Sequence, residues 1–130
     1  MILFKPEHVP MILDGRKTET RRLAQAGRRA RWVVGGYHHC YTRPPFALGG
    51  SKPFALVRIT KTPRVEPLGE ITEAGAVAEG YASRAEYLKA FWRINPKGVQ
   101  KMTREALDRG VILGDGWALP VWVVTFELAS

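Results

Sequence analysis

The sequence predicts an α+β fold in which a small barrel of strands is covered on one side by helices. Three observations lead to this prediction. Segments that favour strands dominate residues 2–62, helical patterns occupy residues 72–109, and an alternating strand pattern closes the chain at residues 119–128. The 130 residues fit a single domain, 1–130, long enough to bury a core without disulfides or metals to hold it.

The first half of the chain predicts strands around one short helix. Pro6 suits the first turn of that helix, Val9 and Ile12 belong to its apolar stripe, and Gly15 suits a left-handed end. Residues 18–23 are rich in threonine and predict a strand or an extended loop. Further strands are predicted at residues 2–4, 37–42 and 54–62, and residues 24–36 form a basic connection.

The second half predicts helices and a closing strand. Thr72 begins a helical stretch that ends near Gly80. Ser83 and Glu86 have the spacing of a capping box, and the helix behind them ends at Asn95, because a proline follows. A short helix at residues 103–109 and a strand at residues 119–128 complete the predicted elements.

Positive charge is concentrated in one part of the chain. The net charge is +8, but residues 16–64 hold twelve basic residues and one acidic residue, and the rest of the chain is acidic overall. Basic side chains beside aromatic ones are typical of surfaces that bind phosphates and stack bases. RNA is therefore the predicted partner; a solvated basic face and a surface that docks an acidic protein are the alternatives. The densest run comprises Arg16, Lys17, Arg21, Arg22, Arg28, Arg29 and Arg31.

Residues 12–22 carry a motif that resembles the ASCH domain family, whose fold is a PUA-like β-barrel. The family motif consists of a glycine, a lysine, an acidic residue and an arginine, which here correspond to Gly15, Lys17, Thr20 and Arg22. Thr20 departs from the motif, since the family has glutamate there. The resemblance implies a small PUA-like β-barrel with flanking helices that binds RNA or a nucleotide in a basic cleft. It extends to residues 54–60, 66–72, 78–83 and 120–128.

One subgroup of that family, the small acetylcytidine amidohydrolases, has a threonine at the position of Thr20. Resemblance to this subgroup implies a catalytic triad of Lys17, Thr20 and Glu79, which would remove an acyl group from a modified cytidine or a related nucleoside. A threonine hydroxyl becomes nucleophilic when a base takes its proton, and a carboxyl group can protonate the leaving amine. Without catalysis, the three residues would be a phosphate contact, a strand residue and a helix-terminal carboxylate.

Geometry places a condition on this triad. On a regular strand Lys17 and Thr20 would face opposite sides, so a turn or bulge between Gly15 and Thr20 is required. The helix that ends at Gly80 must also lie over the segment after Gly15. We therefore expect the Glu79 carboxylate within about 6 Å of the Lys17 amine or the Thr20 hydroxyl, so that one ligand atom or water bridges them.

Other candidate residues carry weaker signals. Trp117 lies in a glycine-rich loop and either stacks on a base or anchors the loop to the core. His38 and Cys40 share a strand face, but a metal site needs three or four ligands and no second pair is evident. The sequence therefore predicts no metal and no other cofactor. The predicted ligand contacts are Arg16, Lys17, Arg21, Arg22, Arg43 and Trp117.

The apolar stretches of the chain are short. None reaches the roughly 18 residues that a membrane span requires. The first apolar run breaks after four residues, at Lys5, which is unlike a signal peptide. These observations predict a cytoplasmic protein with no membrane partner.

Overall fold

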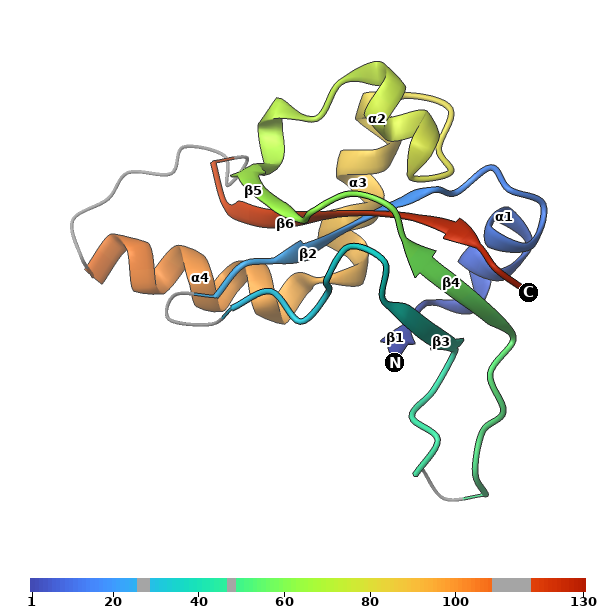
Figure 1. Cartoon of the computed structure of the whole chain (residues 1–130). Helices are drawn as coiled ribbons and strands as arrows, with labels where there is room; N and C mark the ends of the chain where they lie inside the picture. Colours follow the sequence, from blue (N-terminus) through green and yellow to red (C-terminus); the bar gives the residue numbers. More distant parts are fainter. Residues whose placement is uncertain (26–28, 47–48, 109–117) are drawn as a thin grey trace.

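The fold is known from a computed structural model that describes residues 1–25, 29–46, 49–108 and 118–130, with the backbone alone for 106–108. Within these residues, a mixed sheet curves into a half-barrel and is joined by four α-helices, which is the predicted α+β class (Figure 1). The elements are β1 (Ile2–Leu3), η1 (Pro6–His8), α1 (Val9–Leu13), β2 (Glu19–Leu23), β3 (Tyr37–Tyr41), β4 (Ala55–Ile59), β5 (Arg64–Pro67), η2 (Leu68–Glu70), α2 (Glu73–Ala78), α3 (Arg84–Ile94), α4 (Pro96–Asp108) and β6 (Pro120–Leu128).

The sheet is organised around β6. Its strand order is β1-β3-β4-β6-β2, and β5 pairs with β6 beside this path. β1 runs parallel to β3, and the other described pairs are antiparallel. β2 pairs with β6 from Glu19↔Thr125 to Leu23↔Val121. β1 and β2 therefore stand at the two ends of the path, where the half-barrel remains open.

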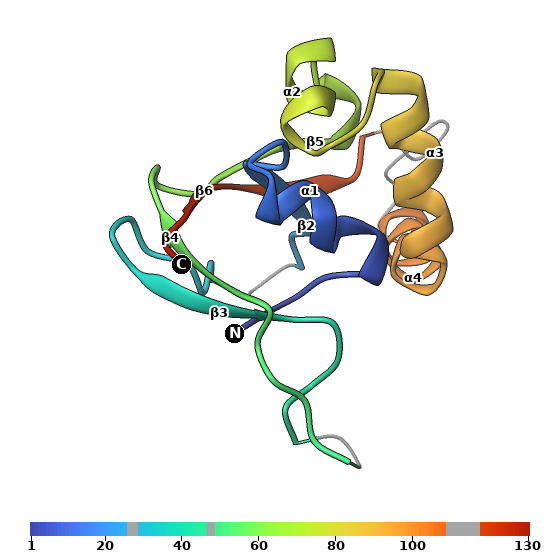
Figure 2. The ribbon, with the colours of Figure 1, turned by 90° about the vertical axis from the view of Figure 1, so that its right-hand side faces the viewer.

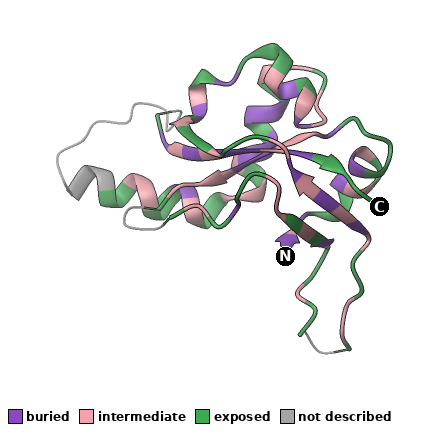
Figure 3. Ribbon diagram, viewed as in Figure 1, coloured by how far each residue is buried: buried purple, intermediate pink, exposed green. Residues whose placement is uncertain are grey.

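Two clusters of buried side chains hold the sheet and helices together. Val124 and Phe126 of β6 belong to the first cluster, with residues of β1, β3, β4 and α1. Val121 belongs to the second, with residues of η2, α2, α3 and α4. Figure 3 shows buried residues along β6 and β4 and mostly exposed or intermediate ones along the loop between β3 and β4. Because β6 enters both clusters, it fixes α1 and α2 relative to each other.

The helix starts follow the predicted caps. Thr72 Oγ1 accepts a hydrogen bond of 2.9 Å from Gly75 N, and α2 begins at the next residue. Ser83 Oγ likewise accepts from Glu86 N at 3.2 Å, and α3 begins behind it. These caps satisfy amide groups that the helices leave without internal partners.

Two elements differ from the prediction. A helix was predicted at 103–109; its described residues, 103–108, are the second half of α4, which already begins at Pro96. Proline ends α3 but suits the first position of a new helix, because the N–H that it lacks is not needed there. β5 was not predicted, since its Val65 is half exposed and no alternation marks it. Its pairing with β6 makes it a strand.

A second view shows how the helices are arranged. In Figure 2, α1 occupies the middle of the molecule, with β3 and β4 to its left and α3 and α4 to its right. The connection between β3 and β4 projects away from the body of the molecule in both ribbon views. None of the helices in the described part of the chain has the length and apolar character needed to cross a bilayer.

Candidate functional site

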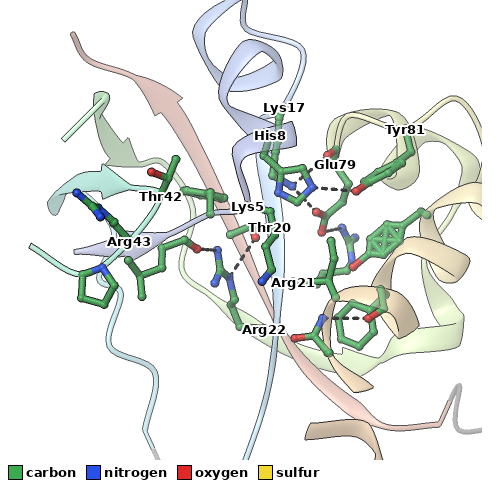
Figure 4. A pocket seen from close by; sticks show the side chains of 17 residues that line it. Lys5, His8, Lys17, Thr20, Arg21, Arg22, Thr42, Arg43, Glu79 and Tyr81 are labelled. Carbon is green, nitrogen blue, oxygen red and sulfur yellow. Dashed lines mark hydrogen bonds and ion pairs between the residues drawn. The ribbon is translucent and has the colours of Figure 1, made fainter. Parts of the chain in front are cut away.

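A cavity of about 350 Å³ lies between the end of β1, η1, β2, the end of α2, α3 and the segment after β3 (Figure 4). Lysine and arginine side chains line part of its wall, and aromatic side chains line another part. The lining residues are Leu3, Phe4, Lys5, His8, Lys17, Thr20, Arg21, Arg22, Thr42, Arg43, Pro44, Glu79, Tyr81, Tyr87, Phe91, Ile94 and Asn95. The cavity thus gathers six of the seven predicted functional residues that lie in the described part of the chain, all except Arg16.

The end of α1 determines where Lys17 lies. Gly15 has a φ of +82°, which reverses the chain after the helix at little steric cost. The Lys17 amide then donates a hydrogen bond of 2.9 Å to the Met11 carbonyl. Because β2 begins only at Glu19, the alternation of a strand does not apply to Lys17, and both Lys17 and Thr20 line the cavity. The turn that the triad requires is therefore present.

The end of α2 lies directly against this turn. The Thr18 amide donates to the Ala78 carbonyl at 2.7 Å. Gly80 has a φ of +99°, and a Cβ there would lie 2.5 Å from Met11 Sδ, so a larger residue would be strained and would displace the Met11 side chain of α1. These contacts carry Glu79 to the cavity. The expected approach of this helix to the segment after Gly15 is confirmed.

Glu79 is the centre of a buried group of charges, which we call the ion cluster: Lys17, Glu19, Arg21, Glu66 and Glu79. Glu79 Oε1 accepts from Lys17 Nζ at 2.6 Å, within the expected distance, and Glu79 Oε2 from Arg21 Nη1 at 3.2 Å. Lys17 Nζ also donates to the Glu79 carbonyl at 3.0 Å. Arg21 reaches Glu19 at 3.1 Å and Glu66 at 3.4 Å. Both cations of the cluster thus have carboxylate partners inside the protein.

Burial changes the acidity of the groups around the cluster. The Lys17 side chain is 1% exposed, and this burial lowers the pKa of its amine, although Glu79 opposes the shift. Burial and then the Glu79 charge raise the pKa of Tyr87. Burial also raises the pKa of Tyr81, to about 12. Both tyrosines therefore line the cavity as neutral phenols, able to donate a hydrogen bond.

Arg22 differs from its neighbour Arg21 because it contacts no carboxylate within the described residues. Its Nε donates to Thr20 Oγ1 at 3.2 Å, and its Nη2 donates to the Leu3 carbonyl at 2.7 Å. The guanidinium also lies 5.0 Å from the centre of the Phe4 ring. Leu3 belongs to β1 and Arg22 to β2, so one side chain bridges the two unpaired ends of the sheet path.

His8 and Tyr81 form a polar pair in the cavity wall that sequence reasoning did not assign to the site. His8 Nε2 lies 2.8 Å from the Tyr81 hydroxyl. Burial, and then the charge of Lys17, lower the pKa of His8 to about 4, so the ring is neutral near pH 7. One signal in the sequence could have found it. His8 is four residues before Ile12 and therefore continues the buried face of the helix.

The remaining predicted contacts have different positions. Arg43 lines the cavity, where its Nη2 donates to the Gly50 carbonyl at 2.7 Å. Lys5, which was not predicted, also lines it. Arg16 lies outside the cavity, exposed and paired with Asp14 at 2.7 Å. Trp117 lies outside the described residues.

The residues considered for a metal, His38 and Cys40, lie on one face of β3. Cys40 is fully buried, and burial raises the pKa of its thiol to about 11. His38 is partly buried, and burial lowers the pKa of its ring. In residues 1–25, 29–46, 49–108 and 118–130, no three His, Cys, Asp or Glu side chains are grouped as a metal ion would require.

Comparison with solved structures identifies the fold. A protein from Enterococcus faecalis V583, described as a DUF984 protein, superposes with a TM-score of 0.64 at 17% identity, over 95% of this chain and 70% of the other. An ASCH domain from Lactobacillus crispatus JV V101 superposes with a TM-score of 0.61 at 20% identity, over 92% of this chain and 69% of the other. No family model and no curated protein matches the sequence. The chain therefore shares its fold with these two structures, one of which is an ASCH domain.

Proposed function

We propose that the cavity binds one nucleoside or nucleotide unit of RNA. The observation that carries this proposal is the combination of aromatic walls with cations that have no internal carboxylate partner. A volume of about 350 Å³ is at the small end of ligand pockets, which suits one nucleoside rather than a folded element. Phe4, Tyr81 and Tyr87 supply apolar surface for a base, and the Thr20 hydroxyl supplies a hydrogen bond.

The cations of the cavity divide into two groups, which assigns the phosphate contacts. Lys17 and Arg21 are held by carboxylates at 2.6 and 3.2 Å, so their charge is largely compensated. Lys5, Arg22 and Arg43 line the same cavity with no ion pair within the described residues. These three cations are therefore the proposed phosphate contacts.

Binding of cytidine monophosphate and of a short RNA tests this function. Calorimetric titration should show binding at 50 mM salt that weakens at 200 mM, because phosphate binding releases counterions. Arg22→Met should weaken binding of both ligands by roughly 10-fold, as loss of one charge-assisted contact predicts. Arg104→Met, on the exposed side of α4, is the matched control and should bind as the wild type does. Absence of binding at 50 mM salt, or affinity that salt leaves unchanged, would contradict the proposal.

A second candidate function is hydrolysis of an acylated cytidine or a related nucleoside in the same cavity. One observation favours it: the buried Thr20 hydroxyl lines the cavity together with the Lys17–Glu79 pair. The 2.6 Å hydrogen bond of that pair allows a proton to pass from the amine to the carboxylate, which leaves a neutral amine and a carboxylic acid. Burial of Lys17 favours this neutral form of its amine.

The proposed reaction conserves protons through these three residues. Thr20 Oγ attacks the amide carbonyl carbon while Lys17 Nζ takes the hydroxyl proton. The carbon–nitrogen bond then breaks, the leaving amine takes the proton of the Glu79 carboxyl group, and an acyl ester remains on Thr20. Water hydrolyses this ester, giving one proton to Glu79, while Lys17 returns its proton to Thr20 Oγ. The free acid leaves and the starting protonation state is restored.

Two conservative variants at position 20 test this reaction with acetylcytidine. Thr20→Val keeps the shape of the side chain but removes the nucleophile, so turnover should disappear while cytidine monophosphate still binds. Thr20→Ser keeps a hydroxyl and should retain measurable turnover. Absorbance of the acylated base follows the reaction directly. Turnover by Thr20→Val equal to that of the wild type, or no turnover by the wild type, would exclude catalysis and leave binding as the function.

A further inference from the structure

A second hollow, of about 530 Å³, lies beside the cavity described above. Its lining residues come from β1, β2, β6 and the segment that precedes β3, and include Arg22, Arg29, Arg31, Trp32 and Trp122. Of the motif residues, only Arg22 lines this hollow. The hollow contains Arg29, Arg31 and Trp32 of the 24–36 connection, none of which lines the first cavity.

The charge of this hollow is uncompensated. No aspartate or glutamate is among its described lining residues. Arg29 and Arg31 are exposed and form no ion pair within residues 1–25, 29–46, 49–108 and 118–130. Burial lowers the pKa of Arg22, the charge of Glu79 opposes this shift, and repulsion from the nearby Arg31 adds a smaller lowering. An anion between them would relieve this repulsion.

Aromatic side chains accompany these arginines. The guanidinium of Arg31 lies 5.7 Å from the centre of the Trp32 ring, and the buried Trp32 thereby orients the exposed Arg31. Trp122 of β6 is only partly buried and lines the same hollow. An indole beside arginines suits a base attached to a phosphate better than it suits an acidic peptide, because the base stacks while the phosphate pairs.

The two hollows share part of their walls. Leu3 and Arg22 line both of them. These are also the residues joined by the 2.7 Å hydrogen bond that spans the unpaired strands β1 and β2. A ligand that extends from one hollow into the other therefore passes the Arg22 guanidinium, which is where a phosphate linking two nucleotides would lie.

We propose that the second hollow binds the nucleotide adjacent to the one held in the cavity, so that the protein recognises its nucleotide within a single strand of RNA. This inference rests on the proposed function. Arg22 contacts the linking phosphate, Arg29 and Arg31 contact the next one, and Trp122 stacks on the neighbouring base. A free nucleoside occupies only the cavity and forgoes these contacts.

The test compares ligand length in the wild type and in the double variant Arg29→Ser/Arg31→Ser. Calorimetric titration with cytidine monophosphate and with a cytidine tetranucleotide should show the tetranucleotide binding at least roughly 10-fold tighter to the wild type, as two added phosphate contacts predict. The double variant should bind the monophosphate like the wild type but lose this gain. The control Lys89→Ser/Arg104→Ser removes the same charge from α3 and α4 and should retain the gain.

The outcomes separate the two proposals. If the monophosphate binds but the tetranucleotide binds no tighter, the second subsite is wrong and the proposed function stands. If the double variant retains the gain in affinity, the subsite is likewise wrong. If the wild type binds neither ligand, both proposals fail. A hexaglutamate peptide is titrated in parallel, and binding of this peptide as tight as that of the tetranucleotide would assign the hollow to an acidic protein instead.

Discussion

Arg21 and Arg22 are consecutive residues of β2, but they belong to two different regions of the molecule. Arg21 is part of the ion cluster, where its guanidinium contacts Glu19, Glu66 and Glu79 between 3.1 and 3.4 Å. Arg22 points to the other side of the strand, where its partners are the neutral oxygens of Thr20 and Leu3. An arginine therefore stabilises the protein at position 21, whereas an arginine at position 22 remains available to an anion.

This difference teaches how the net charge of +8 should be interpreted. A basic sequence attracts polyanions as a whole, but only cations without internal partners can contact a phosphate without breaking an ion pair. In the ion cluster, Lys17 and Arg21 are already paired with carboxylates. Arg22 has no carboxylate partner within the described residues, so it can contact a phosphate without breaking an ion pair. The comparison leads to four predictions, from the largest expected effect to the smallest.

The largest effect should come from removing the charge at the centre of the ion cluster. Glu79→Gln leaves Lys17 and Arg21 buried beside a neutral amide, and should lower the free energy of unfolding by about 3–5 kcal/mol, the usual loss when one partner of a buried ion pair is removed. Urea denaturation measures this. Glu127→Gln, whose exposed partner is Arg58, is the control and should change stability by less than about 1 kcal/mol. Equal losses for both variants would show that the cluster is not structural.

The two neighbouring arginines should separate stability from binding. Arg21→Met should cost about 3 kcal/mol, at the low end for a buried pair because Lys17 still compensates Glu79. Arg22→Met should cost only about 1–2 kcal/mol, since its hydrogen bonds are to neutral oxygens. Its RNA affinity should nevertheless fall more than that of Arg21→Met. Urea denaturation and RNA titration of both variants test whether Arg21→Met loses more stability and Arg22→Met loses more RNA affinity. Parallel changes in stability and affinity would remove the distinction between the regions.

The sequence predicts much of this site because its local signals are strong. The caps at Thr72 and Ser83, and the glycines at positions 15 and 80, each act through their own neighbours in the chain. Such signals place the ends of α1 and α2 correctly. The grouping of Lys17 with Glu79 followed from the resemblance to the amidohydrolase subgroup, because no local rule joins residues that are 62 positions apart.

The division between Arg21 and Arg22 could not be predicted in the same way. Period-two alternation indicates that the two side chains face opposite sides, but not which side holds carboxylates. The answer depends on Glu66 and Glu79, which are 45 and 58 residues away. Glu66 belongs to β5, the strand that the sequence pattern did not reveal. His8 was missed for a related reason, since its partner Tyr81 is 73 residues away.

His8 gives a prediction for pH, because it senses the charge inside the ion cluster. Its pKa is about 4 in the folded protein and 6.5 in an ordinary environment, through burial and then the charge of Lys17. Between these values the unfolded chain binds the extra proton, so stability must fall as the pH falls. From pH 7 to 4.5 the wild type should lose roughly 2 kcal/mol more than His8→Gln, which cannot titrate. Urea denaturation at both pH values measures the difference. If the free energy of unfolding had the same pH dependence in both proteins, the pKa of His8 would be the same in the folded and unfolded chains, which contradicts the prediction.

The smallest effect is expected at Arg16, a third kind of cation. It belongs to the basic run that suggests a phosphate contact, but it is exposed, lies outside both hollows and pairs with Asp14 at 2.7 Å. Arg16→Ser should therefore change RNA affinity by less than about twofold at 150 mM salt, where a charge beyond a Debye length of about 8 Å is largely screened. Arg22→Met removes the same formal charge six residues further on and should weaken binding roughly 10-fold. Titrations of both variants with one tetranucleotide make the comparison direct. If the two affinities fell equally, binding would follow the total charge of the protein, and the absence of internal partners around Arg22 would have no functional meaning.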